Sequence, residues 1–215
     1  MIKLWFDGAC KRNGKPDCIS AGGVFVLHNG ASKQLTGHEF NSTSQRGELQ
    51  AFILTLHAIV NSKEDMAYVV TDSEYIFNAV TKEWYRNWER KDWVTAMNEP
   101  VKNKDLWIII AGLLHLIRDV ECVYYHIKGH VLSIGKVTGA TYIAKDPTCW
   151  ALYERLLEIY GTVKPEKLGV ARELFAKNHE FEVDDEALKF LIVGNMAADT
   201  VATTYLDNLV AKLEG

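Results

Sequence analysis

Three strand-like segments follow one another at the start of the chain, before any helical pattern appears. Residues 2–7, 19–29 and 33–40 are rich in apolar residues, and Asn29-Gly30 between the second and third is a strong signal for a tight hairpin turn. Because strands joined by tight turns pair antiparallel, we expect the sheet to begin as a three-stranded antiparallel meander.

An alternation of helix and strand comes after the meander. Helical spacing of apolar residues begins just after Thr43 and Ser44, either of which can cap the helix. Residues 67–71 form a short apolar run that is typical of a buried strand and ends at Asp72. A strand, a helix and a second strand predict a parallel crossover, which places Asp7 and Asp72 on adjacent central strands.

The remaining segments continue the alternation with one interruption. Residues 73–83 and 106–117 have helical spacing, residues 121–127 read as a strand, and a last helix is expected from about Asn195.

The interruption is residues 131–194, which contain three further helical patterns in succession. They predict a helical subdomain inserted into an α/β domain. The predicted fold is therefore a five-stranded mixed sheet flanked by helices, built from residues 1–130 and 195–215, with residues 131–194 as the insertion.

Four acidic residues are placed where they can meet at one edge of this sheet. Asp7 and Asp72 end apolar runs, Glu48 lies near the start of the first helix, and Asp199 opens the last one. Four carboxylates in one place repel one another strongly unless divalent cations neutralise them. Hard oxygen ligands select Mg²⁺ or Mn²⁺, and a pair of such ions is the usual machinery for cleaving phosphodiesters. Nucleic-acid hydrolysis is therefore the leading hypothesis.

Composition limits the remaining choices. With a formal net charge of -4, the chain must bind nucleic acid through a local basic surface. The four cysteines are scattered without C-x-x-C spacing, which favours reduced thiols over a zinc site. The chain begins directly with a strand pattern, and the apolar stretch 106–117 is too short to cross a bilayer, so we expect a cytoplasmic protein without membrane association.

Several short motifs occur in the order found in one family. They are DGAC, SQRGEL, TDSEY, WYRNW followed by PVKNKDLW, HIKGH and the helical AAD. Because these motifs occur in this order, the chain resembles the type 1 ribonucleases H, which cut the RNA strand of RNA–DNA hybrids. The resemblance covers about two thirds of the chain, namely residues 1–130 and roughly the last twenty.

The resemblance implies a set of catalytic residues. Asp7, Glu48, Asp72 and Asp199 match the carboxylates that bind two Mg²⁺ ions, for which Mn²⁺ could substitute. His130 matches the histidine of a mobile loop that assists proton transfer or product release, a role suited to imidazole. The implied reaction is in-line attack of an activated water on an RNA phosphate, leaving 5′-phosphate and 3′-hydroxyl ends.

It also implies a set of substrate-binding residues. The minor groove of the hybrid, with the 2′-hydroxyls that distinguish RNA, is expected to meet Gly8, Asn13, Ser44 and Gln45. A pocket for a phosphate of the DNA strand matches Thr43 and Asn87. The segment from Lys82 to Lys104 resembles a substrate-gripping handle, with six basic and four acidic side chains. The handle residues expected to touch the DNA strand are Trp84, Trp88, Lys91 and Trp93, although its tryptophans have the alternative role of packing the handle helix.

Three features depart from the family pattern. Residues 131–198 stand where the family has a short connection, and we predict that the insertion contacts substrate, as a lid or a clamp on the hybrid. The alternatives are a dimer contact, a dock for a protein partner, and a surface insertion without catalytic role. Glu74 adds a negative charge beside Asp72, which predicts weaker hybrid binding or a preference for Mn²⁺ unless the side chain faces water. Gly47 lies inside a predicted helix, and one hypothesis is that it admits the backbone of the hybrid.

Two other functions remain open on this sequence. A resolvase- or integrase-like nuclease would share the carboxylate geometry but act on DNA. A non-catalytic module would bind hybrid or RNA without cutting it. The handle and the HIKGH motif argue against the first, and the full set of carboxylates argues against the second, because anions near phosphates give a binding module no advantage.

Overall fold

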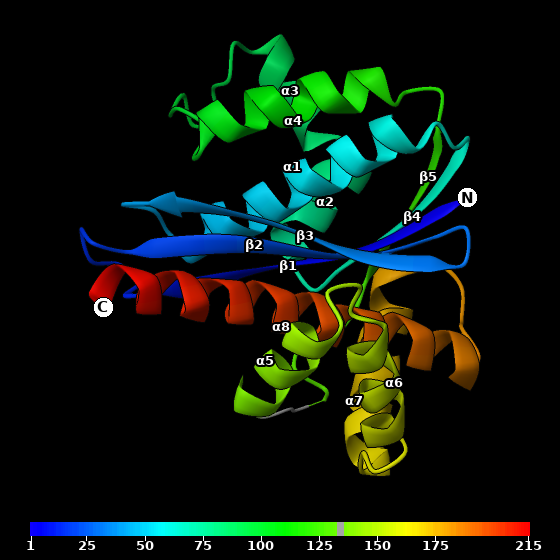
Figure 1. The fold of residues 1–215 in the computed structure, drawn as a ribbon. Coiled ribbons are helices and arrows are strands. Elements are labelled where there is room, and N and C mark those ends of the chain that lie inside the picture. The colour runs from blue at the N-terminus through cyan, green and yellow to red at the C-terminus, as the bar shows by residue number, and fades with distance from the viewer. Residues whose placement is uncertain (133–135) are drawn as a thin grey trace.

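A central mixed sheet with helices on both faces forms the fold (Figure 1). The computed structural model describes residues 1–132 and 136–215; residues 133–135 of the predicted insertion lie outside the described residues. The strands are β1 (Ile2–Lys11), β2 (Ile19–His28), β3 (Ala31–Phe40), β4 (Met66–Thr71) and β5 (Glu121–His126). The helices are α1 (Ser44–Ser62), α2 (Glu74–Thr81), α3 (Trp84–Arg90), α4 (Lys104–Leu116), α5 (Lys136–Lys145), α6 (Trp150–Tyr160), α7 (Pro165–Asn178) and α8 (Asp185–Glu214).

The strand order is β3-β2-β1-β4-β5. The first three strands pair antiparallel and β4 pairs with β1 in parallel, as predicted. Strand β5 pairs with β4, also in parallel. His28 pairs with Ala31, so the β2–β3 hairpin has a two-residue loop in which Asn29 and Gly30 both have positive φ. Such a loop matches the twist of the strands, which is why the Asn-Gly pair fixes the turn here.

Each face of the sheet is buried by a different group of helices. On one face Leu4, Phe6 and Val24 pack with α1, α2 and α4. On the other face Trp5 and Phe25 pack with α6, α7 and α8 (Figure 1). Because successive side chains of a strand point to opposite faces, a strand covered on both sides reads as a continuous apolar run, which is what residues 4–6 show. Helices α6 and α7, which lie in the predicted insertion, therefore share a core with the sheet.

Helix α1 begins where the sequence indicated. Thr43 is the N-cap, and its Oγ1 accepts a hydrogen bond from the backbone N–H of Arg46 at 3.3 Å. This bond satisfies one of the free N–H groups of the first turn.

The prediction that the last helix begins near Asn195 is wrong. A single helix, α8, runs from Asp185 to Glu214, and the Asp184 side chain caps it by accepting from Ala187 N at 2.7 Å. The helical spacing in residues 185–194 therefore belongs to this helix. Gly194 lies within it because α8 crosses the indole of Trp5 there, and a Cβ at this position would overlap the ring.

Of the helices in the described part of the chain, none combines the length and apolarity that a membrane span needs.

The contact between Gly194 and Trp5 gives a stability prediction. Replacement of Gly112 by Ala should stabilise the protein by about 0.5–1 kcal/mol, because alanine favours the helix and nothing lies within 4 Å of the new Cβ. Gly194→Ala should instead destabilise it by about 1–3 kcal/mol, because the fully buried Trp5 ring must move. Urea unfolding of the two variants measures both changes, and equal stabilisation would show that α8 does not press on Trp5.

Candidate active site

Asp7 and Asp72 lie on neighbouring parallel strands. The register of β1 and β4 pairs Ile2 with Ala67 and Trp5 with Val70. Continued by two residues, it brings Asp7 opposite Asp72, which follows the last residue of β4. The predicted adjacency of these carboxylates thus follows from the observed register.

Helix α1 carries Glu48 to the same place because its first turn packs closely on the sheet. A Cβ on Gly8 would lie 2.8 Å from the carbonyl carbon of Gly47, and a Cβ on Gly47 would lie 3.0 Å from the Ala21 carbonyl oxygen. Only a residue without a Cβ allows the backbones of α1 and the sheet to lie this close together. The hypothesis that Gly47 admits the hybrid is wrong, because Gly47 is buried against the sheet.

Burial raises the pKa values of Asp7 and Glu48, and repulsion by neighbouring carboxylates adds to this. Desolvation by burial raises the Asp7 pKa well above its ordinary value, and the charges of Asp72, Asp199 and Glu48 raise it further. Burial also raises the pKa of Glu48, and the charge of Asp72 adds to this. The charges of all three other predicted metal ligands therefore act on the Asp7 carboxyl.

The loop after β5 completes this edge. Nδ1 of His130 lies 4.0 Å from Oδ2 of Asp199, and 79% of the His130 side chain is exposed. Gly129 lies so close to Asp72 that a Cβ there would overlap the carboxylate. Burial raises the Asp72 pKa, while the charge of His130 and a hydrogen bond from the Asn195 side chain lower it. The structure thus brings the five predicted catalytic residues to one edge of the sheet.

The carboxylates fit a divalent cation by their chemistry. Within the described residues, no group of three or more His, Cys, Asp or Glu side chains is already arranged to hold a metal ion. Three carboxylates are each held by a neighbouring donor: Asp7 by Gly8 N–H at 2.6 Å, Glu48 by the Ser73 hydroxyl at 2.6 Å, and Asp72 by the Asn195 side chain. The set offers hard oxygen ligands. Burial raises the pKa values of Asp7, Glu48 and Asp72, and at Asp7 and Glu48 neighbouring carboxylates add a repulsion that a cation would relieve.

Two of these donors are residues that sequence reasoning missed. Asn195 is 3% exposed and stands four residues before Asp199, so it lies on the same face of α8 one turn earlier. That spacing was a usable signal. Ser73 follows Asp72 directly, but nothing in the sequence pairs it with Glu48. Glu74, the next residue, is exposed, and its effect on hybrid binding stays a prediction.

The predicted minor-groove residues gather at the start of α1. Asn13 and Ser44 exchange two hydrogen bonds of 3.3 Å, and Gln45 Oε1 accepts from the side-chain amide of Asn103 at 3.0 Å. Gly8 lies beside them in β1. Their contact with a nucleic acid stays a prediction.

The handle tryptophans differ in what they can reach. Trp88 packs edge-on against Trp107 with ring centroids 5.2 Å apart, and Trp84 is partly exposed. Trp93 is 8% exposed within the core, so its position favours packing over the predicted contact with the DNA strand.

Asn87 and Lys91 are exposed on or next to α3. Oδ1 of Asn87 accepts a hydrogen bond from Arg90 at 2.5 Å, which places a cation beside the predicted DNA-phosphate pocket.

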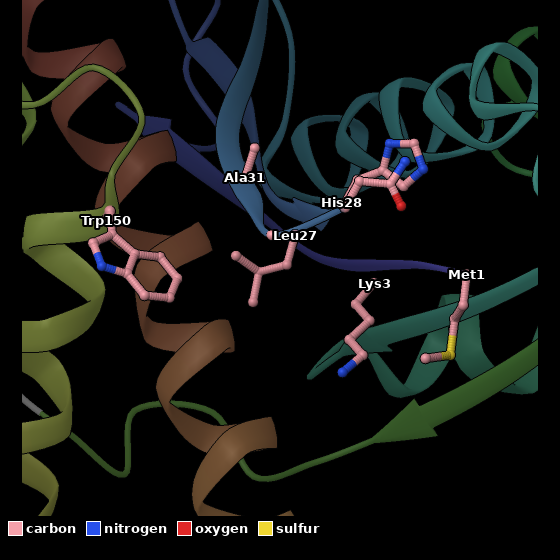
Figure 2. A pocket seen from close by; sticks show the side chains of 8 residues that line it. Met1, Lys3, Leu27, His28, Ala31 and Trp150 are labelled. Atoms are coloured by element: carbon pink, nitrogen blue, oxygen red, sulfur yellow. The ribbon is translucent and has the colours of Figure 1, made fainter.

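A cavity of about 320 Å³ lies away from these residues, at the amino end of β1 (Figure 2). Its lining includes Met1, Lys3, His28 and Trp150 and contains no carboxylate side chain. The cavity therefore has no evident part in the carboxylate site.

Comparison with known proteins identifies the family of this chain. The RNase H family model matches residues 1–139. The chain is 41% identical over 130 residues to a protein of Pseudomonas putida (strain W619) named Ribonuclease H, covering 60% of this chain and 82% of that protein. It is 36% identical over 131 residues to the Ribonuclease H of Erythrobacter litoralis (strain HTCC2594), covering 60% and 83%.

Two solved structures share the fold. The PFV RNase H domain superposes with a TM-score of 0.51 at 21% identity, covering 71% of this chain and 94% of that one. LC9-RNase H1, described as a type 1 RNase H with the type 2 active-site motif, gives 0.51 at 18% identity, covering 86% and 89%. Together with the family match over more than half of its length, these findings show that the chain belongs to the ribonuclease H family of hydrolases.

Proposed function

We propose that this protein hydrolyses the RNA strand of RNA–DNA hybrids at the edge formed by Asp7, Glu48, Asp72 and Asp199. The observation that carries the proposal is geometric. The register of β1 and β4 brings Asp7 opposite Asp72, the contact of Gly8 with α1 sets Glu48 beside them, and His130 lies 4.0 Å from Asp199. Family membership and the names of the relatives support hybrid RNA as the substrate.

The four carboxylates would hold two divalent ions, preferably Mg²⁺ with Mn²⁺ as a substitute. When bound, such ions lower the pKa of an attacking water and stabilise the leaving 3′ oxygen, which leaves 5′-phosphate and 3′-hydroxyl ends. The Gly8–Gly47 contact holds Asp7 and Glu48 at a fixed separation. Ser73 and Asn195 orient Glu48 and Asp72.

His130 would move a proton at the leaving group or help the product depart. Its ring is exposed, close to Asp199, and follows Gly129, so it can swing without losing packing. The groups at the start of α1 would recognise the 2′-hydroxyls of the RNA strand.

The insertion would contact the same substrate. A cavity of about 260 Å³ between the catalytic loop and α7 is lined in part by Lys128, His130 and Lys167, and an adjoining cavity is lined in part by Lys164. All three lysines are exposed, whereas Arg172 in α7 is ion-paired with Asp185. Exposed ammonium groups beside the catalytic loop suit the phosphates of a bound strand.

Three other expectations from the sequence stay predictions. They are the division into domain and insertion, the dock for a protein partner and the cytoplasmic location.

The activity is tested by incubating the protein and Mg²⁺ with a labelled RNA–DNA hybrid, single-stranded RNA and duplex DNA in parallel. We expect cleavage of the RNA in the hybrid alone. Asp72→Asn should lower kcat by at least about 100-fold, because it removes one of the carboxylates that hold the ions. Cleavage of duplex DNA would favour a DNA nuclease, and binding without cleavage in Mg²⁺ or Mn²⁺ would favour a non-catalytic module.

The repulsion at Asp7 predicts how stability depends on pH without metal. The pKa of Asp7 is higher in the folded state than in the unfolded state. The contribution of the protonated Asp7 carboxyl to the free energy of unfolding is therefore complete below the unfolded-state pKa. It is lost as pH rises through the folded-state pKa. In EDTA, Asp7→Asn should therefore raise Tm more at pH 8 than at pH 5, by about 2–4 °C per kcal/mol. Mg²⁺ should raise Tm of the unmodified protein more than that of the variant.

The matched control for this experiment is Asp119→Asn, since the Asp119 side chain is 90% exposed. It should shift Tm equally at both pH values. The same result for Asp7→Asn would contradict the proposed clustering.

The lysine-lined surface predicts a change in salt dependence. Lys164→Ala combined with Lys167→Ala should raise KM for the hybrid and leave kcat nearly unchanged. The slope of log KM against log salt concentration should fall by about 1 for each phosphate that a lysine no longer neutralises. Lys33→Ala, which removes an exposed lysine from β3, is the control. Unchanged KM and slope in the double variant would exclude α7 from substrate binding.

A further inference from the structure

The end of helix α7 in the inserted segment is joined to the end of strand β5. Nδ2 of Asn178, the last residue of α7, lies 2.7 Å from Nδ1 of His126, the last residue of β5. Nε2 of His126 lies 3.1 Å from the carbonyl oxygen of Asp72. A hydrogen-bonded path therefore runs from the insertion through one imidazole to the backbone of a carboxylate residue in the active site.

The chemistry of these groups fixes the direction of both bonds. A carbonyl oxygen only accepts, so Nε2 of His126 must carry a proton and donate it to Asp72. In the neutral ring Nδ1 is then an acceptor, and the amide nitrogen of Asn178 is the donor that it requires. Asn178 thus selects the tautomer in which His126 can bind Asp72.

A second contact holds the backbone of His126. Its N–H donates to Nε2 of His179 at 3.1 Å, and burial lowers the pKa of His179, which favours the neutral ring that this bond needs. The His179 ring packs on Phe175 with centroids 4.1 Å apart, and the His126 ring stacks on Phe77 at 5.4 Å. His126 is only 4% exposed, so its ring has little freedom to turn.

We propose that Asn178 is a positioning residue for the active site and that it acts on Asp72 through the tautomer of His126. The insertion then contributes to catalysis by fixing the end of β4, in addition to any contact with substrate. This role rests on the proposed function only for its effect on the rate. The tautomer and the affinity for Mg²⁺ can be measured without a nucleic acid.

The test compares Asn178→Ala with Asn208→Ala, which removes an exposed asparagine from α8. Nitrogen-15 NMR of the imidazoles should show that Asn178→Ala lowers the population of the Nε2-protonated tautomer of His126. Mg²⁺ affinity, measured by calorimetry, should fall by about 10-fold or more, as is usual when a residue supporting a metal ligand is removed. On hybrid, kcat should fall by a similar factor while KM stays within about 2-fold.

A second pair of variants separates positioning from packing. His126→Gln retains an amide N–H that can donate to Asp72 and should keep more Mg²⁺ affinity than His126→Leu, which has no donor. The proposal is overturned if Asn178→Ala leaves the tautomer and Mg²⁺ affinity at the values of Asn208→Ala. If both change but no hybrid is cut, the positioning role stands and the proposed activity fails.

Discussion

The contact between β1 and the first turn of α1 decides where the carboxylates of this site can lie. Gly8 and Gly47 face each other across that contact; Asp7 directly precedes Gly8, and Glu48 directly follows Gly47. A side chain at Gly8 would overlap the backbone of Gly47 and Glu48 and would separate these two carboxylates. Close packing here serves the site at the expense of helix propensity, since glycine inside a helix is unfavourable by about 1 kcal/mol.

Bringing these carboxylates together is electrostatically unfavourable. Asp7 is 8% exposed and adjacent to three like charges, so its ionised form is disfavoured. Two extensive apolar cores, one on each face of the sheet, supply the stability that allows such a cluster. Helices α6 and α7 contribute to the second core, which makes them part of the framework that holds Trp5 and, through α8, Asp199.

Local patterns were sufficient to predict the sheet and most of the helices. The resemblance to the family named the five candidate catalytic residues, which the structure brings to one edge of the sheet. Asp7 and Asp72 could be paired because a strand–helix–strand succession has few topologies. What failed depended on tertiary contacts. The start of α8 was misplaced because the sequence does not show that the helical spacing of residues 185–194 continues into the last helix, past the crossing of Trp5 at Gly194. Gly47 was assigned to substrate because the sequence does not show which face of α1 meets the sheet, and the link from Asn178 to Asp72 joins residues more than a hundred positions apart.

The central claim is that four carboxylates from four elements form one metal site, and carbon-13 NMR of the side-chain carboxyls during a Mg²⁺ titration tests it most directly. The account predicts that the signals of Asp7, Glu48, Asp72 and Asp199 shift together along saturating curves, while that of Asp119 does not move. Asp199 staying unchanged while the other three shift, or no saturable change at any of the four, would contradict it.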